Sequence, residues 1–126
     1  MAASRALRLS ALLVALGALV GAAGCKPSVG DSCHLSTDCS VTGDRLCDTS
    51  MPDGYCTIFN CNPNNCPDGA ACVEFHQGNV RFSRRFCLAE CGKPSDCRPG
   101  YVCIDPKSRD GVITDDNPDH STVCLP

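Results

Sequence analysis

The chain has 126 residues, with 11 Lys and Arg against 14 Asp and Glu and a formal net charge of −3. This balance argues against a nucleic-acid partner, because proteins that bind nucleic acid concentrate positive charge on one face. Thirteen cysteines stand beside only four Phe, two Tyr and no Trp. Such a composition is typical of small exported proteins in which disulfides take the place of a large apolar core.

The first 24 residues have the pattern of a secretory signal peptide. Arg5 and Arg8 are charged, no acidic residue appears before Asp31, and the run 9–24 is uncharged and ends in small residues. A positive start, an apolar centre and a small-residue end are the three parts of such a peptide. A membrane-spanning helix needs about 20 apolar residues, more than this run supplies. We therefore expect an exported protein from which residues 1–24 are removed.

The end of the leader, GAAGC at positions 21–25, resembles the lipobox of bacterial lipoproteins. Ala23 and Gly24 match the small residues of that motif, whereas Ala22 stands where Leu is usual. The resemblance implies that the thiol of Cys25 receives a diacylglycerol. It also implies that Cys25 then becomes the first residue and is acylated on its new amino group.

The odd number of cysteines supports lipidation of Cys25. Of the thirteen cysteines, twelve would remain to pair, whereas ordinary cleavage near Ala22 or Ala23 would leave an unpaired thiol in an oxidising compartment. Two acyl chains anchor a protein stably, since each buried methylene contributes about 0.8 kcal/mol. The lipoprotein resemblance, with Lys26 rather than Asp after the anchor, implies the cell envelope and sorting to the outer membrane.

Residues 25–32 are expected to be the lipidated cysteine and a flexible tether, because the sequence KPSVGDS is polar and contains Pro and Gly. The body, residues 33–126, contains three units of four cysteines: unit 1 (33–56), unit 2 (61–87) and unit 3 (91–124). We expect a small disulfide-rich fold of irregular coil and short β-hairpins, with negligible helix outside the signal peptide. The predicted disulfide cysteines are Cys33, Cys39, Cys47, Cys56, Cys61, Cys66, Cys72, Cys87, Cys91, Cys97, Cys103 and Cys124.

Several other positions repeat between the units. An Asp or Asn precedes each second cysteine and a Gly follows it, which predicts a turn in which the side chain bonds the backbone and Gly takes a positive φ. Apolar residues precede the third and fourth cysteines and are expected to pack on the disulfides. These positions are Asp38, Asn65 and Asp96; Gly43, Gly69 and Gly100; Leu46, Ala71 and Val102; and Tyr55, Phe86 and Val123.

The stretch CGKPSDCRPGYVC, residues 91–103, carries a loose resemblance to EGF-like and whey-acidic-protein-like modules. EGF modules use six cysteines and the whey-acidic type has adjacent cysteines, so this chain departs from both. Four cysteines allow three pairings. The EGF-like resemblance implies first-to-third and second-to-fourth bonds, for example Cys91–Cys103 and Cys97–Cys124.

The segment 73–86, VEFHQGNVRFSRRF, predicts a β-hairpin. Gly78-Asn79 suits a two-residue type II′ turn, which would place Phe75 opposite Phe82 and His76 opposite Arg81. Phenylalanine pairs across strands stabilise a hairpin by about 0.2–1 kcal/mol.

This hairpin also carries the candidate binding patch, which consists of Arg81, Phe82, Arg84 and Arg85. Clustered positive charge with an aromatic ring would suit an anionic polysaccharide, lipid headgroups or an acidic partner. The alternative is that the phenylalanines face inward and the arginines are solvated, some of them pairing with Glu74.

Metal and catalytic sites are weakly indicated. No C-x2-C pair occurs, so structural zinc and thiol redox chemistry are not expected. The acidic loop 110–119 offers oxygen ligands for calcium but lacks the EF-hand order, and the alternative is a solvated loop. His34, His76 and His120 lie in no nucleophile motif. We expect no cofactor and no enzyme activity.

The sequence therefore predicts a lipid-anchored protein of the cell envelope with a rigid, non-catalytic interaction or structural body. Binding to an envelope or extracellular protein or polysaccharide is expected on the long loops 73–86 and 104–123, because loops on a fixed scaffold carry contacts. The alternative is a protease inhibitor, secreted or anchored, in which a disulfide-braced loop enters an enzyme cleft.

Overall fold

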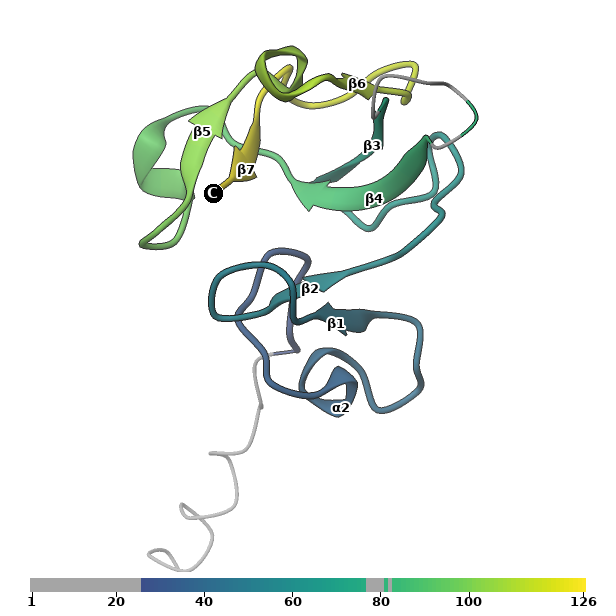
Figure 1. The fold of residues 1–126 in the computed structure, drawn as a ribbon, viewed down its shortest axis with the longest axis vertical. Coiled ribbons are helices and arrows are strands. Elements are labelled where there is room, and N and C mark those ends of the chain that lie inside the picture. The colour runs from purple at the N-terminus through teal and green to yellow at the C-terminus, as the bar shows by residue number, and fades with distance from the viewer. Residues whose placement is uncertain (1–25, 77–80, 82) are drawn as a thin grey trace, which may run out of the picture.

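The computed structural model describes residues 26–76, 81 and 83–126. In this part of the chain, short antiparallel strands form two two-stranded sheets and one three-stranded sheet, and the α-helix is limited to a single four-residue segment. Figure 1 shows unit 1 at one end of the molecule and units 2 and 3 side by side at the other. The fold is thus the small disulfide-rich class that the composition predicts.

Unit 1 consists of helix α2 (Ser36–Cys39) packed against a hairpin of strands β1 (Leu46–Asp48) and β2 (Tyr55–Thr57). Cys47 lies directly opposite Cys56 in this hairpin. The first cysteine of the unit lies in the loop before α2 and the second lies in α2. Both disulfides of the unit therefore join the segment that contains this loop and α2 to the hairpin.

Unit 2 is built on the longest hairpin, strands β3 (Ala70–Phe75) and β4 (Arg84–Ala89), in which Cys72 lies opposite Cys87. Unit 3 contains the 3-10 helices η2 (Pro94–Asp96) and η3 (Pro106–Arg109), and strands β5 (Val102–Ile104), β6 (Gly111–Ile113) and β7 (Val123–Leu125). Strands β5 and β7 pair with Cys103 opposite Cys124. Strand β6 instead pairs with β3, giving the sheet order β4-β3-β6. The long loop 104–123 therefore completes the sheet of unit 2.

The same disulfide arrangement recurs in all three units. The third and fourth cysteines face each other across the hairpin, and their bonds run to the first and second cysteines respectively. This is the pairing that the EGF-like resemblance implies. The six bonds are Cys33–Cys47, Cys39–Cys56, Cys61–Cys72, Cys66–Cys87, Cys91–Cys103 and Cys97–Cys124. Since a bridge that closes about 15 residues stabilises by roughly 3 kcal/mol in the chain-entropy model, these bonds can hold the fold with little core.

The predicted turns are present, with one exception. The carboxylate of Asp38 accepts hydrogen bonds from the backbone N–H groups of His34 and Leu35. In unit 3, the carboxylate of Asp96 accepts the two equivalent hydrogen bonds from backbone N–H groups. The glycines that follow, Gly43, Gly69 and Gly100, all have positive φ. In unit 2 it is Asp115, from the unit 3 loop, whose carboxylate accepts from the N–H groups of Asn64 and Cys72.

The core is small and is formed largely by cysteines with Tyr55, Ala71, Val73, Leu88 and Val123, all of them buried. The prediction that apolar residues beside the cysteines pack inward is wrong at two positions: Leu46 is 40% exposed and Val102 is 49% exposed. These residues begin β1 and β5, each of which belongs to a sheet of only two strands.

The hairpin of unit 2 forms, but in a register shifted by two residues from the predicted one. Phe75 lies opposite Arg84 and not Phe82, in the same register that puts Cys72 opposite Cys87. Phe82 and the predicted turn Gly78-Asn79 lie outside the described residues. Strand β3 ends at Phe75 and β4 begins at Arg84.

The segment after Cys25 also differs from the flexible tether predicted for it. Val29 is 8% exposed, the N–H of Gly30 donates to the Cys56 carbonyl at 2.9 Å, and the N–H of Cys56 donates to the Asp31 carbonyl at 2.9 Å. The chain is therefore held against β2 from about Ser28 onward.

Candidate binding groove

Unit 1 is joined to the other two units through hydrogen bonds and aromatic contacts. At the end of β2, the Thr57 hydroxyl donates to the Cys87 carbonyl at 2.7 Å, and the N–H of Cys87 donates to the Ile58 carbonyl at 3.1 Å. The Phe59 and Phe86 rings meet edge to face with centroids 5.4 Å apart. These contacts fix unit 1 against β4.

A second junction connects unit 1 to unit 3. The N–H of Ala89 donates to the Tyr55 hydroxyl oxygen at 2.9 Å, and the Tyr55 and Tyr101 rings lie 5.5 Å apart. The Tyr101 hydroxyl donates to the Pro52 carbonyl at 2.8 Å. Burial raises the pKa of Tyr55 to about 12, so this phenol stays protonated at neutral pH and serves as a structural group.

A groove with a volume of about 280 Å³ lies between the units. Its walls are mostly apolar and come from all three units, and polar groups stand at Asp48, Ser50 and Arg109. The other lining residues are Met51, Tyr55, Thr57, Phe75, Phe86, Leu88, Leu125 and Pro126. Ligand sites are concave and mostly apolar, and those for drug-sized molecules hold about 300–1,000 Å³. This groove is suited to one or two apolar side chains.

The groove is a site that the sequence did not predict. Its apolar residues lie far apart in the chain and are drawn together by the disulfides and by the junctions between units. The one signal in the sequence is the presence of apolar residues next to cysteines, as at Tyr55 and Phe86, which we interpret in the sequence analysis as disulfide packing.

The predicted basic patch is not a single surface in the described part of the chain. Arg84 and Arg85 are consecutive residues of β4 and therefore point to opposite faces of the sheet. Arg85 lies opposite Glu74, with Nε 3.9 Å from the carboxylate, as in the alternative interpretation. Arg81 is exposed, and Phe82 lies outside the described residues.

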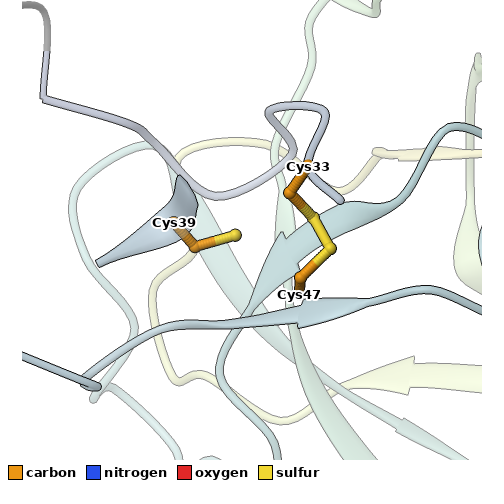
Figure 2. A group of neighbouring side chains, drawn as sticks. All are labelled: Cys33, Cys39 and Cys47. Atoms are coloured by element: carbon orange, nitrogen blue, oxygen red, sulfur yellow. A yellow bond between two sulfur atoms is a disulfide. The ribbon is translucent and has the colours of Figure 1, made fainter. Parts of the chain in front are cut away.

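Three groups of cysteine sulfurs resemble metal sites in their proximity, with sulfur atoms within 4.8 Å of one another. Figure 2 shows the first group, in which Cys33 is bonded to Cys47 and the sulfur of Cys39 lies nearby. The groups arise because each unit places two disulfides side by side. The thiolate is the form of cysteine that binds metal, and disulfide sulfurs are not thiolates. These groups are therefore structural.

The acidic loop 110–119 is held in place by its own side chains. Besides the bonds of Asp115, Asn64 and Asp116 exchange two hydrogen bonds, at 2.8 Å and 3.0 Å. The resulting concave surface, about 210 Å³, also exposes Asp119 and Glu90. Burial raises the pKa of Glu90, and the nearby Asp119 adds to this effect. Asp115 and Asp116 thus attach unit 3 to unit 2.

Among the described residues, no histidine belongs to a group of three or more potential metal ligands, although His76 Nδ1 lies 3.8 Å from the Glu74 carboxylate. His34 follows the first cysteine of unit 1, His76 follows β3, and His120 lies against Gly92 in unit 3. The groups of potential metal ligands among the described residues contain cysteines alone.

No helix in the described chain is long and apolar enough to cross a membrane. Comparison of the chain with protein families, curated proteins and solved structures finds no match.

Proposed function

We propose that this protein is a lipid-anchored, non-catalytic binding protein of the cell envelope, attached to the outer membrane through Cys25. One observation carries the anchor. The six disulfides pair twelve of the thirteen cysteines with one another, which leaves Cys25 no partner within the chain. A lipid on the Cys25 thiol explains both this odd cysteine and the lipobox-like residues before it.

The body is proposed to bind its partner in the groove between unit 1 and the other units. Six disulfides hold the walls in place before binding, so that little conformational entropy is lost when a ligand enters. The apolar walls favour an apolar side chain of an envelope or extracellular protein, and Arg109 and Asp48 supply charged contacts at its edge.

Protease inhibition is the alternative function, and the loop 104–123 does not favour it. That function needs a braced loop that projects into an enzyme cleft. In the loop 104–123, residues 111–113 form β6 and pair with β3, and Asp115 is bonded to the backbone of unit 2. The middle of this loop is therefore held against the sheet.

The anchor is tested by the intact mass of the protein purified from its native membrane, before and after reduction. We expect the mass of a diacylglyceryl or triacyl group on the Cys25 peptide, and twelve thiols that appear after reduction. The Cys25→Ser variant should be released from the membrane with its disulfides intact. A native protein without acyl groups would refute the anchor.

The groove is tested with the fluorescent aromatic sulfonate 8-anilinonaphthalene-1-sulfonate. Its rings suit the apolar walls, and its sulfonate can pair with Arg109. Met51→Lys should reduce the fluorescence gained on binding, because a charge then enters the apolar groove. Val102→Lys is the matched control, since Val102 is exposed and lies outside the groove. Equal loss of fluorescence in both variants would contradict the proposal.

A further inference from the structure

The start of the body limits how far unit 1 can lie from a lipid on Cys25. The N–H of Ser28 donates to the Asp31 carboxylate at 2.7 Å, and Gly30 is bonded to Cys56 in β2. Because the chain is fixed to the body from Ser28 onward, only Lys26 and Pro27 separate the anchor from the folded protein.

This connection is short compared with a membrane. Consecutive Cα atoms lie 3.8 Å apart, so the three steps from Cys25 to Ser28 span at most about 11 Å. The headgroup region of one leaflet is roughly 5–8 Å thick, half the difference between the whole bilayer and its hydrocarbon core. A lipid on Cys25 would therefore bring unit 1 into contact with the membrane surface.

Unit 1 exposes apolar side chains on the segment around α2. Leu35, which precedes α2, is 66% exposed, and Val41, which follows it, is 92% exposed. Leu46, on the strand that packs against α2, is 40% exposed. Figure 1 shows α2 on the side of unit 1 away from units 2 and 3.

We propose that unit 1 rests on the membrane that holds the Cys25 lipid, with Leu35 and Val41 inserted among the headgroups. This inference rests on the lipid anchor proposed above. It orients the molecule so that units 2 and 3 and the groove face away from the bilayer, where a partner can reach them.

The charges near α2 indicate which lipids this surface tolerates. Backbone N–H groups of Leu35 and His34 lower the pKa of Asp38, and the hydroxyls of Ser40 and Thr42 lower that of Asp44 to about 2. Both carboxylates are therefore ionised at neutral pH and would be repelled by anionic headgroups. The contact should be apolar in origin and strongest on zwitterionic lipids.

The absence of tryptophan from the chain allows a direct test, because one introduced tryptophan is the only indole fluorophore. Val41→Trp and the control Val112→Trp are purified in the lipidated form, which mass spectrometry checks, and placed in phosphatidylcholine vesicles with plain or brominated acyl chains. Val112 is 43% exposed and lies on β6, in the sheet of unit 2.

We expect brominated vesicles to quench the tryptophan at position 41 and to leave that at position 112 unchanged. Leu35→Trp should behave like Val41→Trp. Equal intensity in plain and brominated vesicles at both positions 35 and 41, on acylated protein, overturns this inference and leaves the anchor intact. Protein without acyl chains overturns the anchor and this inference with it.

Discussion

The guanidinium of Arg98 lies 4.2 Å from the ring centroid of Tyr101, and the two side chains together hold a turn of unit 1. Arg98 Nη2 donates to the carbonyls of Pro52 and Gly54, and the Tyr101 hydroxyl donates to the same Pro52 carbonyl. A cation over an aromatic face contributes about 0.5–2 kcal/mol, depending on how far it is desolvated. This pair is therefore the main side-chain link from unit 3 to unit 1.

Tyr101→Phe keeps the ring but removes the hydrogen bond to Pro52, and we expect it to lower the free energy of unfolding by about 1 kcal/mol. Arg98→Ala removes the stacked cation and two hydrogen bonds, so its effect should be larger. Urea unfolding with the disulfides intact measures both. Val102→Ala, beside the pair but half exposed, is the control and should change little. Wild-type stability in Arg98→Ala would show that the junction does not hold unit 1.

Gly54 is the glycine whose replacement should be most damaging. Its φ is +66°, and an added Cβ would lie 2.0 Å from the backbone carbonyl oxygen of Cys33. Gly54→Ala should therefore prevent unit 1 from closing, and disulfide mapping after refolding should find Cys33–Cys47 and Cys39–Cys56 reduced in yield.

The matched control for that variant is Gly100→Ala. Gly100 also has a positive φ, +85°, but an added Cβ meets nothing within 4 Å. The Gly100→Ala substitution should lower the free energy of unfolding only by the backbone strain, about 1–2 kcal/mol. The variant should refold with all native disulfide bonds. Equal yields from the two variants would contradict the close contact at Cys33.

These positions show which parts of the structure could be predicted from the sequence. The Asp38 and Asp96 turns, the positive φ of the glycines and the three-unit scaffold follow from local spacing, and the disulfide pairing follows from the resemblance to EGF-like modules. The link from Tyr101 to Pro52 joins residues 49 positions apart, and no spacing rule connects them. The apolar groove depends on such links and could not be foreseen.

The hairpin of unit 2 was predicted in the wrong register for a related reason. Gly78-Asn79 favours a two-residue turn by its local preference, whereas the sheet has the register that puts Cys72 opposite Cys87, as the third and fourth cysteines are opposite each other in every unit. The tether prediction failed similarly. Pro and Gly indicated flexibility, but Val29 is buried and Gly30 is bonded to β2.

The two tyrosines should titrate above their ordinary range. Burial raises the pKa of Tyr55 to about 12, and it also raises the pKa of Tyr101. Because the folded protein keeps the Tyr55 proton more tightly than the unfolded chain, its contribution to stability is complete below pH 10. That contribution is lost as pH rises from about 10 to about 12, with a size on the order of 2–3 kcal/mol.

Absorbance of tyrosinate measures this directly, because the chain has only two tyrosines. Tyr55→Phe should remove the highest-pH phase and leave the Tyr101 phase. In denaturant, both residues of the wild type should titrate near 10. A folded-state titration of both near 10 would show that Tyr55 is accessible to water.

Asp115 is expected to hold the loop of unit 3 on unit 2. Its carboxylate accepts from the N–H of Asn64 and, at 2.8 Å, from that of Cys72. In Asp115→Asn the uncharged amide has one oxygen left to accept, so one N–H loses its partner. We expect a loss of about 1.5 kcal/mol, the lower end of the range for hydrogen bonds to charged groups. Hydrogen exchange should then accelerate at Asn64, Cys72 and across β6, while β1 and β2 stay protected.

Asp68→Asn, on the same concave surface, is the control and should leave exchange in β6 unchanged. Unchanged exchange in Asp115→Asn as well would mean that the pairing of β6 with β3 holds the loop without this carboxylate.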